Sequence, residues 1–253
     1  MDNQSNNKVT LVQFPAMFGL PNVSPFCMKV ETFLRMASIP YEVKEEVNTT
    51  KAPKKKFPYI IHNGKKIPDS SFVLDYLSEE YCIDFNSHLS IQDQAVSRAF
   101  QRLFEENLFW VLAYSRWFED HNWKVIKEAF FSSLPPILKG FLPNQIKKDL
   151  EVKLKAQGIG RHSKEEIYDI GLKDLRAIID QLGAKPFFMG DRVSQIDATA
   201  YAFISNILLP EFQSPLDELS KTAENLKNYC NRMQNLYFPE LLAKQEEPEM
   251  LGV

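Results

Sequence analysis

The sequence is poor in the features that mark several large functional classes. Its 253 residues include only 9 glycines, and neither GxGxxG nor GxxxxGK[ST] occurs, so the phosphate-cradling loops of dinucleotide-binding and P-loop proteins are absent. Only three cysteines are present, and the sequence has no CxxC or HExxH motif, which are common signatures of zinc and redox sites. We therefore expect no bound metal and no dinucleotide cofactor.

Charge and hydropathy exclude two further classes. The formal net charge is −3, whereas nucleic-acid binders usually carry a strongly basic face, so we expect no nucleic acid partner. No apolar run approaches the roughly 18 residues needed to span a bilayer, which predicts no membrane span. The cysteines are odd in number and widely spaced (Cys27, Cys82 and Cys230). This pattern indicates free thiols in a reducing compartment, and hence a cytoplasmic location.

The chain changes character near residue 85. Before that point short β-rich runs alternate with helical patterns, and the runs are Val9–Phe14, Tyr41–Val47, Pro58–Ile61 and, after an Asn-Gly turn, Lys66–Ile67. The period-two alternation in the second run indicates a half-buried strand. Helices are expected after Ser24-Pro25 and from Asp69-Ser70, because these residue types favour helix starts. The order predicts a parallel strand pair joined by a crossover helix, followed by an antiparallel hairpin.

After residue 90 the β signals vanish and the pattern becomes helical. Residues 92–118 are predicted to form one long helix. Ser163-x-x-Glu166 is a capping box, and Ser194-x-x-Asp197 is expected to open another helix. Residues 83–91 form the expected linker. The fold class is therefore α/β plus all-α, with an N-terminal mixed domain and a helical C-terminal domain.

The first stretch that could carry chemistry is Ser24-Pro25-Phe26-Cys27, at a predicted helix start. A helix N-terminus stabilises a thiolate. Ser24 could therefore donate a hydrogen bond to a bound thiolate, or Cys27 could itself be an activated thiol. The alternative is that Ser24 only caps the helix and Cys27 is a small buried residue.

Two further stretches could bind a ligand. Pro58 opens a β run, and a cis bond after Phe57 would leave the Phe57 backbone free to pair with an extended peptide. A trans proline at a strand start is the alternative. At the next helix start, Ser70 would bind a carboxylate and Asp69 an ammonium group, unless the pair is an ordinary helix cap.

Taken in order, these elements resemble the glutathione transferase fold, and the resemblance covers nearly the whole chain. More narrowly, SPFCMKVETFLRMASIPYE and FPYIIHNGKKIPDSSFVLDYL are similar to the metaxin and failed-axon-connections branch of that superfamily. The resemblance implies a thioredoxin-like, glutathione-binding domain over residues 8–82 and an all-helical domain over residues 92–240.

The same resemblance assigns roles to the candidate residues. Ser24 stands where the family places the hydroxyl or thiol that activates glutathione. Phe57 and Pro58 match the segment that pairs with the cysteinyl part of glutathione, and Asp69 and Ser70 match the pair that holds its γ-glutamyl end. The implied protein is a homodimeric transferase that uses glutathione as co-substrate and conjugates it to a hydrophobic electrophile, as in detoxification.

Two departures from the family pattern keep other functions open. The loop over residues 15–23 is long, and residues 48–56 leave little room for the family's usual second helix. The lysines in that segment could substitute electrostatically or form a solvated loop. The chain could therefore be a non-catalytic module that binds a protein partner. A third alternative is a glutathione-dependent thiol reductase using Cys27, although we expect Cys27 to be mostly structural.

Overall fold

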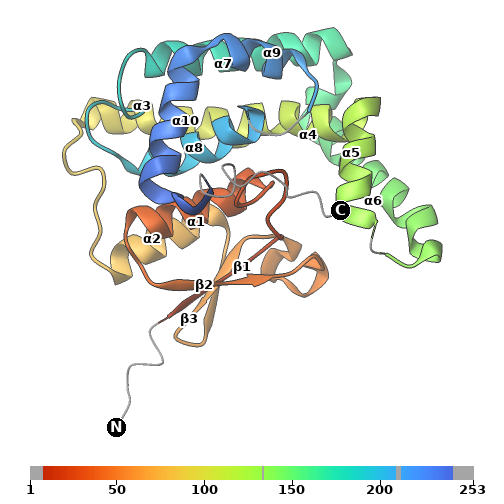
Figure 1. Cartoon of the computed structure of the whole chain (residues 1–253), viewed down its shortest axis with the longest axis horizontal. Helices are drawn as coiled ribbons and strands as arrows, with labels where there is room; N and C mark the ends of the chain where they lie inside the picture. Colours follow the sequence, from red (N-terminus) through yellow and green to blue (C-terminus); the bar gives the residue numbers. More distant parts are fainter. Residues whose placement is uncertain (1–7, 133, 209–211, 242–253) are drawn as a thin grey trace, which may run out of the picture.

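The N-terminal part of the protein is built on a four-stranded mixed sheet. The computed structural model describes residues 8–132, 134–208 and 212–241 (Figure 1). The strands lie in the order β2-β1-β3-β4, and their bounds are β1 (Val9–Gln13), β2 (Tyr41–Glu45), β3 (Tyr59–His62) and β4 (Lys65–Pro68). Strand β2 is parallel to β1, whereas β3 is antiparallel to both β1 and β4. This is the predicted crossover followed by the predicted hairpin.

The exposure of the strands follows their place in the sheet. The central strand β1 is apolar, and its residues Val9, Leu11 and Val12 are at most 1% exposed. The edge strand β2 differs from its prediction as a half-buried strand. It ends at Glu45, and only Tyr41 is partly buried while the next four residues are exposed. The alternation in its sequence therefore reflects an edge strand with little cover on either face.

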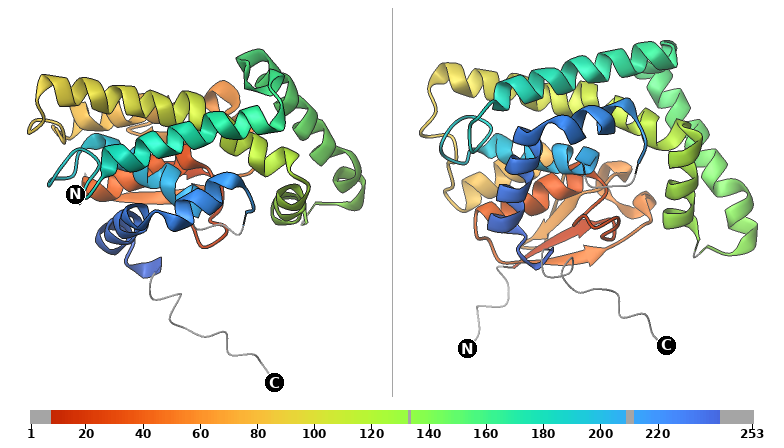
Figure 2. Two further views of the ribbon diagram at one scale, coloured as in Figure 1. Left: turned by 90° about the horizontal axis from the view of Figure 1, so that it is seen from above. Right: turned by 45° about the horizontal axis from the view of Figure 1, so that its top comes forward.

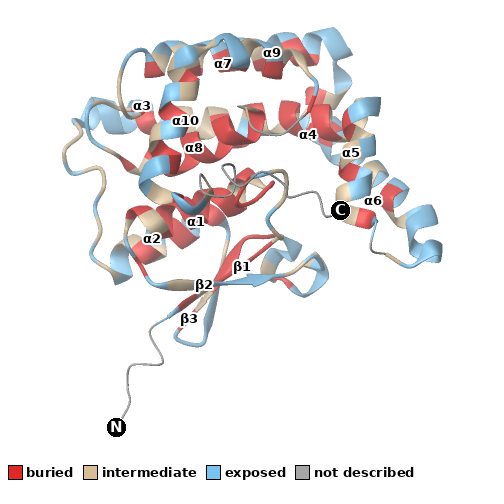
Figure 3. Ribbon diagram, viewed as in Figure 1, coloured by how far each residue is buried: buried red, intermediate tan, exposed pale blue. Residues whose placement is uncertain are grey.

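Helix α1 (Pro25–Met36) is the centre of the molecule. It crosses between β1 and β2, as a parallel pair requires, and its other side packs on α8 (Gln195–Leu208). Ten of its twelve residues are buried, including Phe33 and Leu34. Figure 3 shows the two buried helices facing each other between the sheet and the outer helices. Helix α2 (Ser70–Glu80) packs beside α1.

The rest of the described chain is helical. The predicted helix over residues 92–118 is a continuous rod of three parts, because a π-helical turn interrupts its hydrogen-bond pattern: α3 (Ile91–Arg102), η3 (Leu103–Leu108) and α4 (Phe109–Phe118). The remaining elements are α5 (Asp120–Phe131), α6 (Pro136–Gln157), η4 (Ile159–Arg161), α7 (Lys164–Leu182), α9 (Pro215–Thr222) and α10 (Glu224–Tyr237). No helix in the described ranges is both long and apolar enough to cross a membrane.

Two predicted helix starts in this region are confirmed. Ser163 and Glu166 form a reciprocal capping box at the start of α7. Asp197 accepts hydrogen bonds from the backbone N–H of Ser194 and of Phe188, both at 2.8 Å.

Helices α5 and α6 form an arm beside the main body, with α7 running along α4 (Figure 2). The architecture is a thioredoxin-like domain followed by a helical domain. The boundaries 8–82 and 92–240 stay predictions.

Candidate functional site

Strand pairing gathers the predicted site residues at one end of the sheet. Val12 near the end of β1 pairs with Tyr59, and Tyr59 pairs with Pro68 at the end of β4. The residues just outside these pairs therefore share one edge, and they include Phe57-Pro58 before β3 and Asp69-Ser70 after β4. The Phe57–Pro58 bond is cis, as predicted. The loop that leaves β1 ends at Ser24, where α1 begins.

Ser24 occupies the N-cap position of α1 but does not cap it with its side chain. Its backbone is extended, Pro25 is the first helical residue, and no side-chain cap bond forms. The backbone N–H of Ser24 instead donates to the side-chain oxygen of Asn22 at 3.0 Å. The alternative that the Ser24 hydroxyl only caps the helix is therefore wrong, because the hydroxyl makes no capping bond. Ser24 is half-buried, and its side chain forms a hydrogen bond with the Cys27 thiol.

The loop before Ser24 is held from both domains. Asn22 is fully buried, and its side-chain amide donates to the carbonyl of Phe14 at the end of β1. From the helical domain, the buried guanidinium of Arg116 donates to the carbonyl of Val23 at 2.7 Å. It also donates to the backbone carbonyl and side-chain oxygen of Asn206, both at 2.8 Å. Burial lowers the pKa of Arg116 to about 10, so it remains charged at neutral pH.

The Cys27 side chain is buried against the residues of this same edge rather than exposed on it. It is fully buried in a small apolar cluster whose other members are Val12, Ala52, Phe57 and Tyr59. Burial raises the pKa of the Cys27 thiol to about 12, while hydrogen bonds with the Ser24 side chain and the Phe14 backbone oppose that rise. The thiol therefore stays protonated at neutral pH. The expectation that Cys27 is mostly structural stays a prediction.

Asp69 and Ser70 stand at the start of α2. Asp69 has φ +77°, a region that non-glycine residues rarely adopt and that is often found at functional sites. Its carboxylate accepts the backbone N–H of Ser71 at 3.1 Å and is exposed, so it caps α2 and remains reachable from solvent. Ser70 is 6% exposed and lies directly beside the strand end that carries Pro68.

A buried ion pair that the sequence did not suggest supports this helix start. Lys29 of α1 is fully buried and lies 2.6 Å from the carboxylate of Glu105, which is itself 5% exposed. The Lys29 ammonium also donates to the Ser71 hydroxyl at 3.0 Å, and Gln101 donates to the same hydroxyl at 3.2 Å. The starts of α1 and α2 are thereby tied to the helical domain. The sequence signal for this burial was the position of Lys29 among the apolar residues of α1.

The segment between β2 and β3 departs from the family pattern as expected. Two short 3-10 turns, η1 (Thr49–Lys51) and η2 (Pro53–Lys55), stand where a helix would otherwise be. The four lysines of this segment are exposed. One of them, Lys54, places its ammonium 4.8 Å from the ring centroid of Phe72. The basic loop therefore reaches the start of α2, next to Asp69 and Ser70.

An aromatic wall borders the same end of the sheet, and no pattern in the sequence predicted it. The Phe14 ring meets the Phe57 ring edge-on at a centroid distance of 5.1 Å. It also meets Phe130 of α5 at 6.2 Å. Phe130 comes from the arm, more than 100 residues beyond Phe14. Only the folded chain brings it there.

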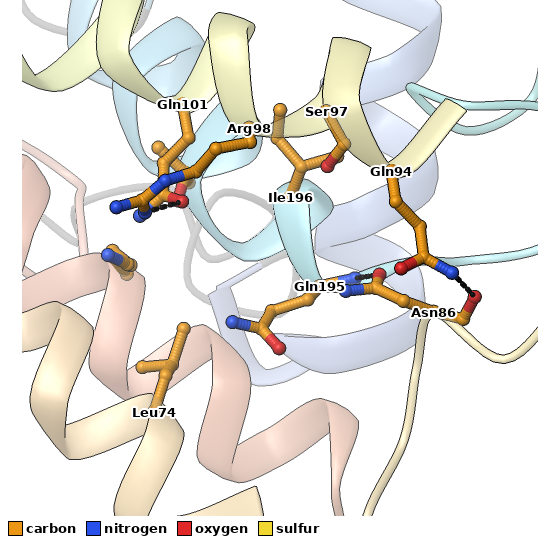
Figure 4. A pocket seen from close by; sticks show the side chains of 10 residues that line it. Leu74, Asn86, Gln94, Ser97, Arg98, Gln101, Gln195 and Ile196 are labelled. Atoms are coloured by element: carbon orange, nitrogen blue, oxygen red, sulfur yellow. Dashed lines mark hydrogen bonds between the residues drawn. The ribbon is translucent and has the colours of Figure 1, made fainter. Parts of the chain in front are cut away.

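A separate polar cavity of about 160 Å³ lies between the two domains. Figure 4 shows Arg98 and Gln101 of α3 across from Leu74 of α2. Lys29, whose ammonium also donates to the Ser71 hydroxyl, lines this cavity too. The volume is below the roughly 300–1,000 Å³ of sites for drug-sized ligands, so the candidate site stays at the sheet edge.

Among the described residues, no group of three or more His, Cys, Asp or Glu side chains could hold a metal ion.

Comparisons with known proteins fit this geometry. Residues 25–122 match the family described as glutathione S-transferase N-terminal domain, and residues 171–233 match the glutathione S-transferase C-terminal domain. The chain is 30% identical to isoprene-epoxide–glutathione S-transferase of Rhodococcus, over 90% of this chain and 99% of that protein.

Two animal relatives place the chain more narrowly. It is 33% identical to failed axon connections of Drosophila melanogaster over 94% of its own length, and the match spans 60% of that longer protein. It is 28% identical to mouse metaxin-1 over 88% of this chain and 73% of that protein.

Solved structures agree on the fold. A glutathione transferase family member from Pseudomonas fluorescens, solved with two glutathione molecules bound, matches 97% of this chain and 95% of its own. The TM-score is 0.60 and the sequence identity 14%. With its four-stranded sheet, cis-proline and helical C-terminal domain, the chain belongs to the glutathione transferase superfamily, in its metaxin-like branch.

Proposed function

We propose that the protein is a glutathione transferase that joins glutathione to a hydrophobic electrophile. One observation carries the proposal: Ser24, Phe57-Pro58 and Asp69-Ser70 meet at one end of the sheet. An extended tripeptide laid along this edge would pair with the Phe57 backbone. The α-carboxylate of its γ-glutamyl end would reach Ser70, and the ammonium group of the same end would reach Asp69.

Ser24 would act on the glutathione sulfur. A hydroxyl has one donor and two acceptor sites, and a protonated thiol is a weak donor. The Ser24 hydrogen bond with Cys27 opposes the rise in the Cys27 pKa, so the Ser24 O–H is the donor in that bond. With glutathione bound, the Ser24 O–H would donate to the glutathione thiolate instead, because a charged sulfur is a stronger acceptor than the protonated Cys27 thiol. A hydrogen bond to the charged form lowers the pKa of the glutathione thiol, and its proton leaves to solvent.

The reaction that follows needs no redox partner. The thiolate electron pair forms a carbon–sulfur bond with the electrophile, and the bond to the leaving group breaks with its electrons. With an epoxide the leaving oxygen stays attached, and it takes a proton from water. The Phe14, Phe57 and Phe130 rings supply an apolar wall for the electrophile. The Rhodococcus relative, whose name includes an epoxide, makes epoxides the first class to test.

The thiol-reductase alternative has less support. That chemistry needs a reactive thiolate, whereas the Cys27 thiol is fully buried and its pKa is raised to about 12 by burial. The non-catalytic alternative draws on the missing helix between β2 and β3 and on the similarity to metaxin-1. It predicts a folded protein with no conjugating activity.

The test is a conjugation assay with glutathione and a panel that contains 1-chloro-2,4-dinitrobenzene and several small epoxides. Turnover above the uncatalysed rate with at least one electrophile supports the proposal. The matched variants are Ser24→Ala and Cys27→Ser, which change the two ends of one hydrogen bond. Loss of activity in the second variant with retention in the first would instead favour the reductase.

We also propose that the protein acts as a homodimer, because two-fold homo-oligomers are the commonest soluble assemblies and the family resemblance implies one. Light scattering should return twice the chain mass of 29.3 kDa. A mass equal to one chain would contradict the dimer without affecting the proposed reaction.

A further inference from the structure

A cavity of about 550 Å³ opens on the helical domain. Its walls come from the end of α4, the start of α5, the start of α7 and the segment that enters α9. The lining includes Tyr114, Phe118, Tyr168, Lys164 and Glu218. This volume is within the range of small-molecule sites.

The cavity lies on the opposite side of α4 from the candidate glutathione site. Arg116 of α4 reaches Val23 in the loop before Ser24. Tyr114 is two residues earlier on the same helix and contacts Tyr168 of α7. Residues two apart on a helix do not share a face. The two sites are therefore separate.

One wall of the cavity is aromatic. The rings of Tyr114 and Phe118 are nearly parallel, with centroids 5.7 Å apart and planes inclined by 11°. Tyr168 meets the Tyr114 ring edge-on at 6.0 Å. The faces of such rings attract cations as well as apolar groups. The chain itself makes one such contact, because the Lys147 ammonium lies 5.3 Å from the Phe118 ring centroid.

The charged groups of the cavity are mostly acidic. Three carboxylates line it, from Glu119, Asp120 and Glu218, against the Lys164 ammonium. The Lys147 ammonium on the Phe118 ring adds a second positive charge beside the cavity. The Lys164 ammonium is already 2.6 Å from a Glu119 oxygen, and the second Glu119 oxygen accepts the Tyr168 hydroxyl at 3.2 Å. Asp120 and Glu218 are both exposed. An aromatic wall beside these two carboxylates suits a positively charged ligand with an apolar body.

We propose that this cavity binds an organic cation, specifically an ammonium group attached to an aryl or alkyl body. The apolar body would lie against Tyr114 and Phe118, and the ammonium would face Asp120 and Glu218. Anionic ligands are disfavoured by the same carboxylates. The site requires neither glutathione nor Ser24, so its test stands apart from that of the proposed transferase.

The experiment is a calorimetric titration of the full chain with benzyltrimethylammonium. Benzenesulfonate and benzyl alcohol serve as an anion and a neutral compound of similar size. Only the cation is expected to bind. Tyr114→Leu should weaken its affinity by about 2- to 30-fold. Because Tyr114 is partly buried, Glu218→Gln provides a surface variant that should also weaken binding, whereas Glu224→Gln, an exposed glutamate paired with Lys227, should not.

Four results would overturn the proposal. The first is the absence of heat from the cation at millimolar concentrations. The second is equal affinity for benzenesulfonate. The third is an unchanged affinity of the cation for Glu218→Gln. The fourth is displacement of the cation by glutathione, which would place the probe in the other site. Failure of the conjugation assay has no bearing on any of these outcomes.

Discussion

Two buried cations cross between the domains, and they are held in different ways. Lys29 of the thioredoxin-like domain pairs with the carboxylate of Glu105. Arg116 of the helical domain instead donates to neutral oxygens, on Val23 and Asn206. Burial lowers the pKa of both groups, and among the residues that the structure describes only Lys29 has a counter-charge within ion-pair distance. The difference suggests that the first contact stabilises the joined domains and the second fixes the loop before Ser24.

The largest expected effect is on stability, from Glu105→Ala. This change leaves the Lys29 ammonium buried without its counter-charge, which costs about 3–5 kcal/mol. Urea unfolding of the variant should show this loss. Replacing both partners with methionine should recover most of it, because an apolar pair carries no desolvation cost. If Glu105→Ala unfolds within 1 kcal/mol of the wild type, about the value of an exposed pair, the ion pair does not hold the domains together.

The next effect is on catalysis, from Ser24→Ala. The variant should lose about 10- to 1,000-fold in kcat, because it removes a hydrogen bond to developing charge on sulfur. Its affinity for glutathione should change little. Cys27→Ser keeps a donor at the same place and should leave conjugation nearly unchanged. Equal losses in both variants would show that Cys27 contributes as much as Ser24.

Arg116→Met tests the second cation. The change leaves the carbonyls of Val23 and Asn206 without their donors, at a cost of about 1–3 kcal/mol for a buried group. Hydrogen exchange should speed up in the peptide that covers residues 15–24 and stay unchanged in β1 and β3. Uniformly faster exchange would mean that Arg116 supports the whole fold, like Glu105, and the contrast between the two cations would disappear.

A pH-dependent effect is expected from a polar pair within the helical domain. The Asp174 carboxylate accepts the Asn107 amide at 2.7 Å, and burial raises its pKa from 3.8 to about 6. The folded protein thus holds this proton more tightly than the unfolded chain, so the associated stability is full below pH 4 and is lost as pH rises through 6. Asp174→Asn should remove this decrease in the free energy of unfolding between pH 4 and pH 6. Parallel stability profiles of variant and wild type from pH 4 to 7 would contradict it.

The sequence was sufficient for the fold because its signals are local. The Asn63-Gly64 turn, the capping box at Ser163 and the proline after Ser24 each act over a few residues. The prediction that β2 is half-buried was wrong, because the alternation of apolar and polar residues cannot distinguish an exposed edge strand from a half-buried strand. The π-helical turn within the long helix had no local signature.

The sequence predicted the residues expected to contact glutathione, but it did not predict the residues that hold them in place. Ser24, Phe57-Pro58 and Asp69-Ser70 lie in recognisable local motifs, whereas their supports come from distant segments. Arg116 is 93 residues from Val23, and Glu105 is 76 residues from Lys29. A charged residue in an amphipathic helix ordinarily faces water, so nothing in the sequence marks Arg116 or Glu105 for burial.

The most direct test of the central claim is a calorimetric titration of glutathione into the wild-type protein and into Ser70→Ala, with Ser87→Ala as an exposed control. We expect the wild type and the control to bind equally. Ser70→Ala should bind more weakly by about 1–3 kcal/mol, because a carboxylate at the start of α2 loses a hydrogen-bond partner. An absence of glutathione binding to the wild type, or unchanged affinity in Ser70→Ala, would contradict a glutathione site at this end of the sheet.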